Sequence, residues 1–211
     1  MKKTYLVIII IILLSFVIST WFYPGMPESI ASHWNTKGDV DGYMSRFWGL
    51  FLMPILSLAI FLLLIFIPRI DPLKANIAKF RNYFDSFIML LIVFLFYIHV
   101  LTVLWNLGVR FDMGQLMMPP LGLLFFYIGV LLERAKRNWF IGIRTPWTLS
   151  SDKVWDKTHK LGAKLFKIAG ISALIGILFP KYGMWLVLVP VLAVTVYTIV
   201  YSYFEYNKEK K

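Results

Sequence analysis

The sequence predicts an all-α integral membrane protein, a polytopic bundle of about six transmembrane helices with both termini inside (N-in/C-in). Three observations lead to this fold class. Of the 211 residues, 59% are hydrophobic and only 16% are charged, whereas about a quarter of a typical soluble domain is charged. Six apolar stretches are long enough to cross about 30 Å of hydrocarbon as helices. The lysines and arginines gather in alternate connecting segments.

The apolar stretches lie at about 4–22, 47–67, 86–106, 114–132, 165–180 and 183–204. Because lipid offers the backbone no hydrogen bonds, each stretch is expected to be helical, and no alternating pattern indicates a barrel. The first stretch follows lysines, as in a signal peptide. Its length, its interfacial aromatic cluster at 21–23 and the lack of a small-x-small cleavage site favour a retained helix. The fifth stretch is short, and a tight turn is predicted at 180–183.

The spans divide the chain into three segments. Residues 1–68 are predicted to form a helical hairpin with an outward loop, and residues 69–132 a central pair of spans. Residues 133–211 would supply an inward loop, an amphipathic helix and a C-terminal pair of spans.

The basic residues set the orientation. With the N-terminus inside, eighteen of the 22 lie on the cytoplasmic side, and the four outside are Lys37, Arg46, Arg110 and Lys181. The positive-inside rule therefore predicts a multi-pass protein of the cell membrane in this orientation. The same bias accounts for the net charge of +11, so no direct binding of nucleic acid is expected.

The outward segment 23–43 combines turn-forming residues with aromatic rings, donors and acceptors, so we expect it to bind a ligand at the membrane face. The candidate ligand-binding residues are Pro27, His33, Trp34, Asn35, Gly38, Asp41 and Tyr43. His33, Asp39 and Asp41 could bind a divalent cation. The spacing of a calcium loop is incomplete, however, so a hydrogen-bonded turn is favoured and no metal site is predicted.

The inward segment 138–151 is interrupted at Thr145-Pro146, and Ser150 or Ser151 is predicted to cap the helix that follows. The candidate partner-binding residues are Asn138, Gly142, Arg144, Thr145, Pro146, Trp147, Thr148 and Trp155. The planar fork of Arg144 suits a carboxylate or phosphate. The alternative is that Arg144 and the tryptophans only anchor the loop to the membrane.

Lysines follow the inward segment at steps of three and four, which places them on one face of a helix. They are Lys153, Lys157, Lys160, Lys164 and Lys167. We expect a lipid-facing basic stripe on an amphipathic helix that lies along the inner leaflet, then turns into the fifth span. Anionic membrane lipids would attract it by about 1 kcal/mol per basic residue. A protein-binding face is the alternative.

Catalytic motifs are absent from the sequence: it has no cysteine, no His-Glu-x-x-His pair, no Gly-x-Ser-x-Gly elbow and no phosphate loop. Glu133 and Arg134 are adjacent on a helix and so point in different directions. His99, within the third span, is expected to bond to a neighbouring helix rather than to carry protons. The sequence predicts no enzyme and no cofactor, and leaves a small-solute or ion transporter and an intramembrane enzyme as alternatives.

Both polar segments resemble known families. The outward one resembles a widespread uncharacterised domain through PGMPESIASHWNTKGDVDGYMSRFWGLFLMP, which fits P-x-x-I-x-x-H-W-x-x-x-G-x-x-D-x-Y. The inward one resembles the signature of SdpI-family membrane proteins through NWFIGIRTPWTLSSDKVWDKTHKLGAKLF. That family is named for immunity against a secreted sporulation-delaying peptide toxin. The resemblance implies a bacterial immunity protein that binds a membrane-active peptide toxin. It also implies signalling by capture of a transcriptional repressor at the membrane.

Overall fold

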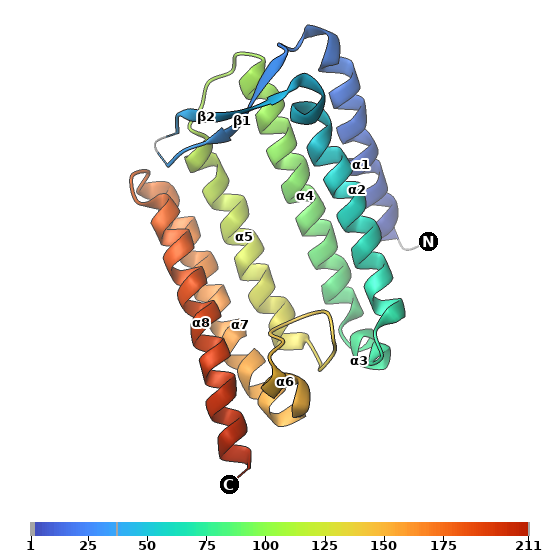
Figure 1. The fold of residues 1–211 in the computed structure, drawn as a ribbon, viewed down its shortest axis with the longest axis vertical. Coiled ribbons are helices and arrows are strands. Elements are labelled where there is room, and N and C mark those ends of the chain that lie inside the picture. Colours follow the sequence, from blue (N-terminus) through green and yellow to red (C-terminus); the bar gives the residue numbers. More distant parts are fainter. Residues whose placement is uncertain (1–2, 37, 211) are drawn as a thin grey trace. The chain divides into compact units, whose positions relative to one another are not determined.

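A computed structural model describes residues 3–36 and 38–210 (Figure 1). Within these residues, six helices are long and apolar enough to cross a membrane. They are α1 (Lys3–Phe22), α2 (Arg46–Ile70), α4 (Arg81–Asn106), α5 (Met113–Arg134), α7 (Asp152–Ile175) and α8 (Gly183–Glu209). The predicted all-α membrane bundle is therefore confirmed.

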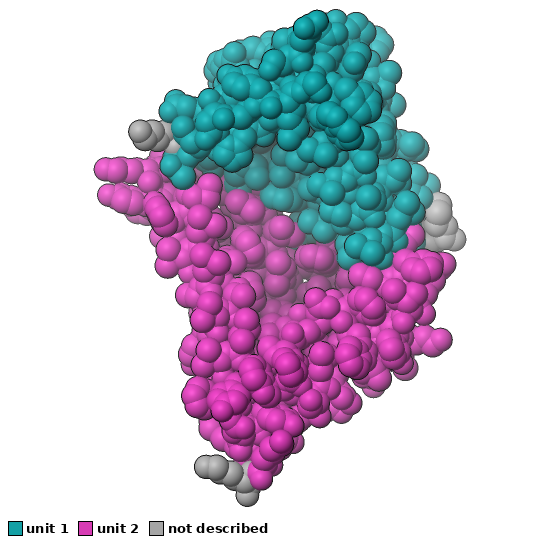
Figure 2. Space-filling model, viewed as in Figure 1, with its two compact units in different colours: residues 1–64, 88–117 teal, residues 65–87, 118–211 magenta. Residues whose placement is uncertain are grey.

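Short elements join these helices. They are η1 (Tyr23–Gly25), β1 (Ser29–Trp34), β2 (Val40–Ser45), α3 (Lys74–Ala78), α6 (Pro146–Ser150) and η2 (Gly176–Leu178). The chain packs into two compact units, coloured separately in Figure 2: residues 1–64 with 88–117, and residues 65–87 with 118–211. The units follow contacts in space, so they do not test the three predicted segments, which follow the order of the spans.

In the first unit, α1, α2 and α4 run side by side (Figure 1) and share buried polar groups as well as an apolar core. Ser19 on α1 donates a hydrogen bond to the Leu50 carbonyl of α2 at 2.8 Å, and its Oγ lies 3.3 Å from Nε2 of His99 on α4. The predicted bond of His99 to a neighbouring helix is therefore present, and His99 is 1% exposed.

In the second unit, α5 and α7 approach so closely that their backbones touch. A Cβ added to Gly170 would lie 2.5 Å from the Phe126 nitrogen and 2.6 Å from the Gly122 carbonyl oxygen. One added to Gly129 would lie 2.6 Å from the Ala163 carbonyl oxygen. Small residues that let backbones meet are the usual means of helix association in lipid. Glycine at these positions therefore sets the distance between α5 and α7.

The fifth span differs from its prediction. The helix α7 begins at Asp152, capped by Ser151, whose hydroxyl accepts a 3.2 Å hydrogen bond from the Val154 nitrogen. It then continues without a break into the apolar part. We therefore correct the prediction of a separate helix along the leaflet. The lysine-bearing turns are the first turns of the fifth span, because no proline interrupts the helix after its cap.

Candidate functional site

The outward segment forms a two-stranded hairpin where sequence reasoning predicted a turned loop. Strands β1 and β2 are antiparallel, with Ile30 opposite Met44 and Trp34 opposite Val40. β-branched and aromatic residues favour strands, but the flanking prolines and glycines concealed this signal. The side chain of Ile30 lies against Gly49 on α2, where a Cβ would overlap it. Glycine at this position thus allows the hairpin to rest on the start of α2.

The turn between the strands explains two of the candidate ligand-binding residues. The Asn35 side chain accepts from the Asp39 nitrogen at 3.1 Å, and the Asn35 nitrogen donates to the Asp39 carbonyl at 2.9 Å. Gly38 has φ +84°, a conformation that side chains rarely adopt. Asn35 and Gly38 therefore shape the turn. Lys37, one of the four basic residues counted outside, lies beyond the described residues.

His33 and Asp41 form an exposed pair across the hairpin. The distance from His33 Nδ1 to Asp41 Oδ1 is 2.5 Å, and the side chains are 71% and 44% exposed. The pair agrees with the hydrogen-bonded interpretation of these residues. Among the described residues, no group of three or more histidines, aspartates and glutamates is arranged to bind a metal. Tyr43, 62% exposed, offers its ring beside them on β2.

The other face of the hairpin is docked on the end of α4. Asn106 accepts from the Ala31 nitrogen at 2.9 Å and donates to its carbonyl at 3.0 Å, so one side chain completes the edge of β1. Trp34 packs edge-on against Trp105, and the Arg110 guanidinium lies 3.7 Å from the centre of the Trp105 ring. Sequence reasoning missed these partners, because no local pattern joins residues so far apart in the chain.

Pro27 helps to join the hairpin to α2 through its backbone carbonyl. Its carbonyl accepts a 3.3 Å hydrogen bond from Nε of Arg46, at the start of α2. The side chains that the hairpin leaves for a ligand are thus His33, Asp41 and Tyr43. Met44 on β2 and Phe47 and Trp48 at the start of α2 are exposed apolar residues close to them in the sequence.

The inward segment is a folded loop rather than an open one. The Asn138 side chain accepts from the Phe140 and Ile141 nitrogens at 2.9 and 2.6 Å. It also donates to the Lys136 and Ile141 carbonyls at 2.9 and 2.8 Å. Asn138 is fully buried, and all of these bonds lie within the loop. Its amide therefore holds the loop closed.

A stacked pair of rings supports the next turn of the loop. Trp155 and His159 lie 3.9 Å apart and nearly parallel. The Trp155 indole donates to the Ala135 carbonyl at 2.9 Å. His159 accepts from the Ile143 nitrogen at 3.0 Å through Nε2 and donates to the Trp155 carbonyl at 2.9 Å through Nδ1. Gly142, with φ +118°, lies so close that any Cβ would overlap His159 Nε2.

Hydroxyl groups join the loop to α8. Thr145 and Thr148 cap α6 reciprocally, and Thr145 Oγ1 lies 3.0 Å from Ser202 Oγ on α8. Ser151 donates to the Glu209 carboxylate at 2.6 Å. The last turns of α8 thus complete the inner loop.

The buried aspartate of the α2–α3 connection also fixes the loop. Asp71 accepts from the Trp139 nitrogen at 2.9 Å and from the Leu73 nitrogen at 2.6 Å. It is 2% exposed. Sequence reasoning missed Asp71, His159 and Ser202 as parts of this region.

These contacts give half of the predicted partner-binding set a structural role, and the whole set stays a prediction. Asn138, Thr145, Thr148 and Trp155 are buried, so a partner cannot touch their side chains in this structure. Gly142 allows the positive φ that the loop backbone needs at this position. Three candidates remain accessible. Arg144 and Pro146 are exposed, and Trp147 is half-buried against Tyr203. Arg144 donates to the Trp139 carbonyl at 2.9 Å through one of its nitrogens.

Two members of the lysine stripe are ion-paired within the protein, and the lipid-facing assignment stays a prediction. Lys157 pairs with Glu205 of α8 at 2.5 Å, and Lys167 pairs with Glu133 of α5. The exposed side chains of Lys153, Lys160 and Lys164 have no ion pair among the described residues. For these three lysines, contact with anionic lipid stays the prediction.

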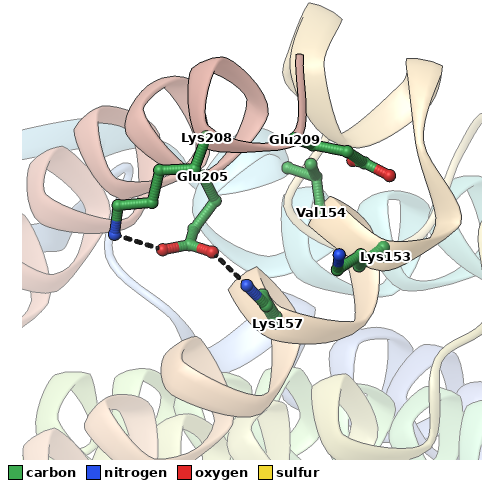
Figure 3. Close-up of a pocket in the computed structure, with 6 residues that line it drawn as sticks. All are labelled: Lys153, Val154, Lys157, Glu205, Lys208 and Glu209. Carbon is green, nitrogen blue, oxygen red and sulfur yellow. Dashed lines mark hydrogen bonds and ion pairs between the residues drawn. The ribbon is translucent and has the colours of Figure 1, made fainter. Parts of the chain in front are cut away.

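A small pocket of about 50 Å³ opens between the first turns of α7 and the last turns of α8 (Figure 3). It is lined by Lys153, Val154, Lys157, Glu205, Lys208 and Glu209. Glu205 is 6% exposed and is held between Lys157 at 2.5 Å and Lys208 at 2.8 Å.

Comparison with known proteins matches both polar segments. Residues 134–202 match the SdpI/YfhL protein family, and residues 10–58 match a domain of unknown function, DUF1648. The chain is 28% identical over 209 residues to "Immunity protein SdpI" of Bacillus subtilis (strain 168). That alignment covers 99% of this chain and 98% of the relative. No solved structure matches the chain significantly.

Proposed function

Since the chain belongs to the SdpI family of multi-pass cell-membrane proteins, we propose that it protects its cell by binding a membrane-active peptide toxin at the membrane. The observation that carries this proposal is the match with an immunity protein over nearly the whole of both chains. A match confined to the inner loop would support shared folding alone. This one also includes the outward hairpin and all six spans.

The outward hairpin is the surface that we propose for the toxin. A peptide that attacks membranes has both apolar and polar side chains, and it approaches from the water or from the lipid surface. The exposed side chains of Met44, Phe47 and Trp48 offer apolar contact, and Tyr43 offers a ring with a polar tip. The exposed His33–Asp41 pair lies on the same hairpin and offers hydrogen bonds. Exposed aromatic residues beside polar ones are typical of peptide-binding surfaces.

A toxin-challenge assay tests the proposal. Toxin-sensitive cells that express the chain should keep growing at a toxin dose that stops cells without it. The variants Tyr43→Ala and Trp48→Ala should reach normal membrane abundance and give less protection. Trp185→Ala is the matched control, because Trp185 on α8 is 59% exposed, similar to Trp48 at 51%. A lack of protection by the wild-type chain would refute the function, and equal losses in all three variants would refute the hairpin as the binding surface.

Capture of a transcriptional repressor at the inner face is a second proposal. Arg144 supports it, because its guanidinium is exposed on a loop that Asn138 and His159 hold in place. A fixed guanidinium can bind a carboxylate in a bidentate manner. The test is whether the repressor moves from the cytosol to the membrane fraction when toxin is added.

Catalysis and transport are weaker proposals. In the inner loop, both ring nitrogens of His159 are bonded to backbone groups, so this histidine is no free general base. Glu133 and Glu205 are paired with lysines. A transporter would instead show toxin-independent movement of a solute, which the same expression strain can measure.

A further inference from the structure

The pocket between α7 and α8 is lined by three lysines and two glutamates, so its charged groups sum to +1. The carboxylates around it already have partners within the protein. Glu205 binds two lysines, and Glu209 accepts from Ser151. On the neighbouring turn of α7, Asp152 and Asp156 pair with Arg137 and Lys136. Lys153, in contrast, lines the pocket and has no ion pair among the described residues.

The buried carboxylate of Glu205 also positions two further donors. Each lysine ammonium carries three N–H groups, and Lys157 and Lys208 each direct one of them at Glu205. Their other N–H groups have no acceptor among the residues that the structure describes, so they can face a ligand. Figure 3 shows both lysines joined to Glu205 at the pocket, with Lys153 beside them and no interaction drawn to it. The shared Glu205 carboxylate keeps both ammonium groups at the pocket, where their other N–H groups can meet an anion.

The size and position of the pocket indicate which anion. About 50 Å³ suits one compact polar group rather than a nucleotide or a folded peptide. The pocket lies at the start of the fifth span and the end of the sixth, which the positive-inside rule places at the cytoplasmic surface. Basic pockets between transmembrane helices on that side bind the head groups of anionic lipids. We propose that this pocket binds the phosphate group of an anionic phospholipid of the inner leaflet.

Lipid retention by the purified full-length chain tests the proposal. The protein is kept in a neutral detergent, which removes the attraction of a charged membrane surface. Phosphatidylglycerol and phosphatidylcholine are titrated separately, and bound lipid is counted by native mass spectrometry. One phosphatidylglycerol should be retained, with phosphatidylcholine bound at least about tenfold more weakly. Lys153→Gln should lower the affinity for phosphatidylglycerol by at least about tenfold, whereas Lys153→Arg should restore it to within about threefold.

Lys164→Gln is the matched control. It removes the same charge from an exposed lysine of α7 that does not line the pocket, and it should change the affinity by less than about threefold. Lys153 makes no ion pair among the described residues, so its loss should leave the protein folded, which circular dichroism can check. Equal binding of the two lipids, or equal losses in the Lys153 and Lys164 variants, would overturn the proposal. Binding of inorganic phosphate without retention of any phosphatidylglycerol would overturn the lipid assignment.

Discussion

Substitution of Gly142 by alanine would show how firmly the stacked Trp155–His159 pair holds the inner loop. At φ +118° a residue with a side chain is strained by about 1–3 kcal/mol. The new Cβ would also overlap His159 Nε2, the acceptor for the Ile143 nitrogen. Loss of that partly buried hydrogen bond costs a further ~1–3 kcal/mol. We therefore expect Gly142→Ala to lower the free energy of unfolding by about 2–6 kcal/mol, if the two costs add.

Two other glycines separate the sources of that cost. Gly108 has φ +98° but nothing within 4 Å of its Cβ position, so Gly108→Ala should show strain without the overlap. Gly25 has neither a positive φ nor a close neighbour, so Gly25→Ala should be almost neutral. Reversible unfolding in mixed micelles, followed by tryptophan fluorescence, measures all three. If Gly142→Ala is no more destabilising than Gly108→Ala, the overlap with His159 is not important and the ring stack does not hold the loop.

Three further predictions concern topology, recognition and packing. Tags after Lys181 should be accessible from outside and tags after Lys74 from inside; a tag after Lys181 that an impermeant reagent cannot label would contradict six spans with this orientation. Arg144→Lys should keep normal membrane abundance, because the charge remains. It should weaken partner binding by about 1–3 kcal/mol and so reduce partner capture or toxin protection, because the bidentate fork is lost. Unchanged capture and protection would mean that Arg144 only anchors the loop. Gly170→Ala should destabilise the protein by about 1–3 kcal/mol, since α5 and α7 must separate, and an unfolding curve identical to that of the wild type would refute backbone contact there.

The spans could be predicted from the sequence because crossing lipid is a local requirement of length and polarity. The fifth span shows where this reasoning weakens. Its first turns are polar enough to be interpreted as a surface helix, yet Ser151 caps one continuous helix that contains both parts. The hairpin was missed for a related reason. Its strands are short, and their pairing depends on contact with Asn106 on another helix.

Part of the candidate site could not be predicted because rare residues in a loop are needed for folding as often as for recognition. Asn138 and Trp155 were interpreted as partner contacts, but their polar atoms are used by backbone groups of the same loop. The partners Asp71 and Ser202 lie far away in the sequence, so no local pattern links them to the loop. The lysine spacing predicted a helix, and all five lysines do lie on α7. The spacing could not reveal that two of the lysines form ion pairs with Glu205 and Glu133 on other helices.

The bonds from Ser202 and Glu209 back to Thr145 and Ser151 have a consequence for biosynthesis. A ribosome makes the inner loop before it makes the last turns of α8. The nascent loop therefore cannot form its bonds to Ser202 and Glu209 until those turns have been made. During that interval Thr145 and Ser151 lack these two bonds. The sixth span is thus the step that completes the inner face, and a chain stalled before residue 202 would be a membrane protein with an unfinished cytoplasmic loop.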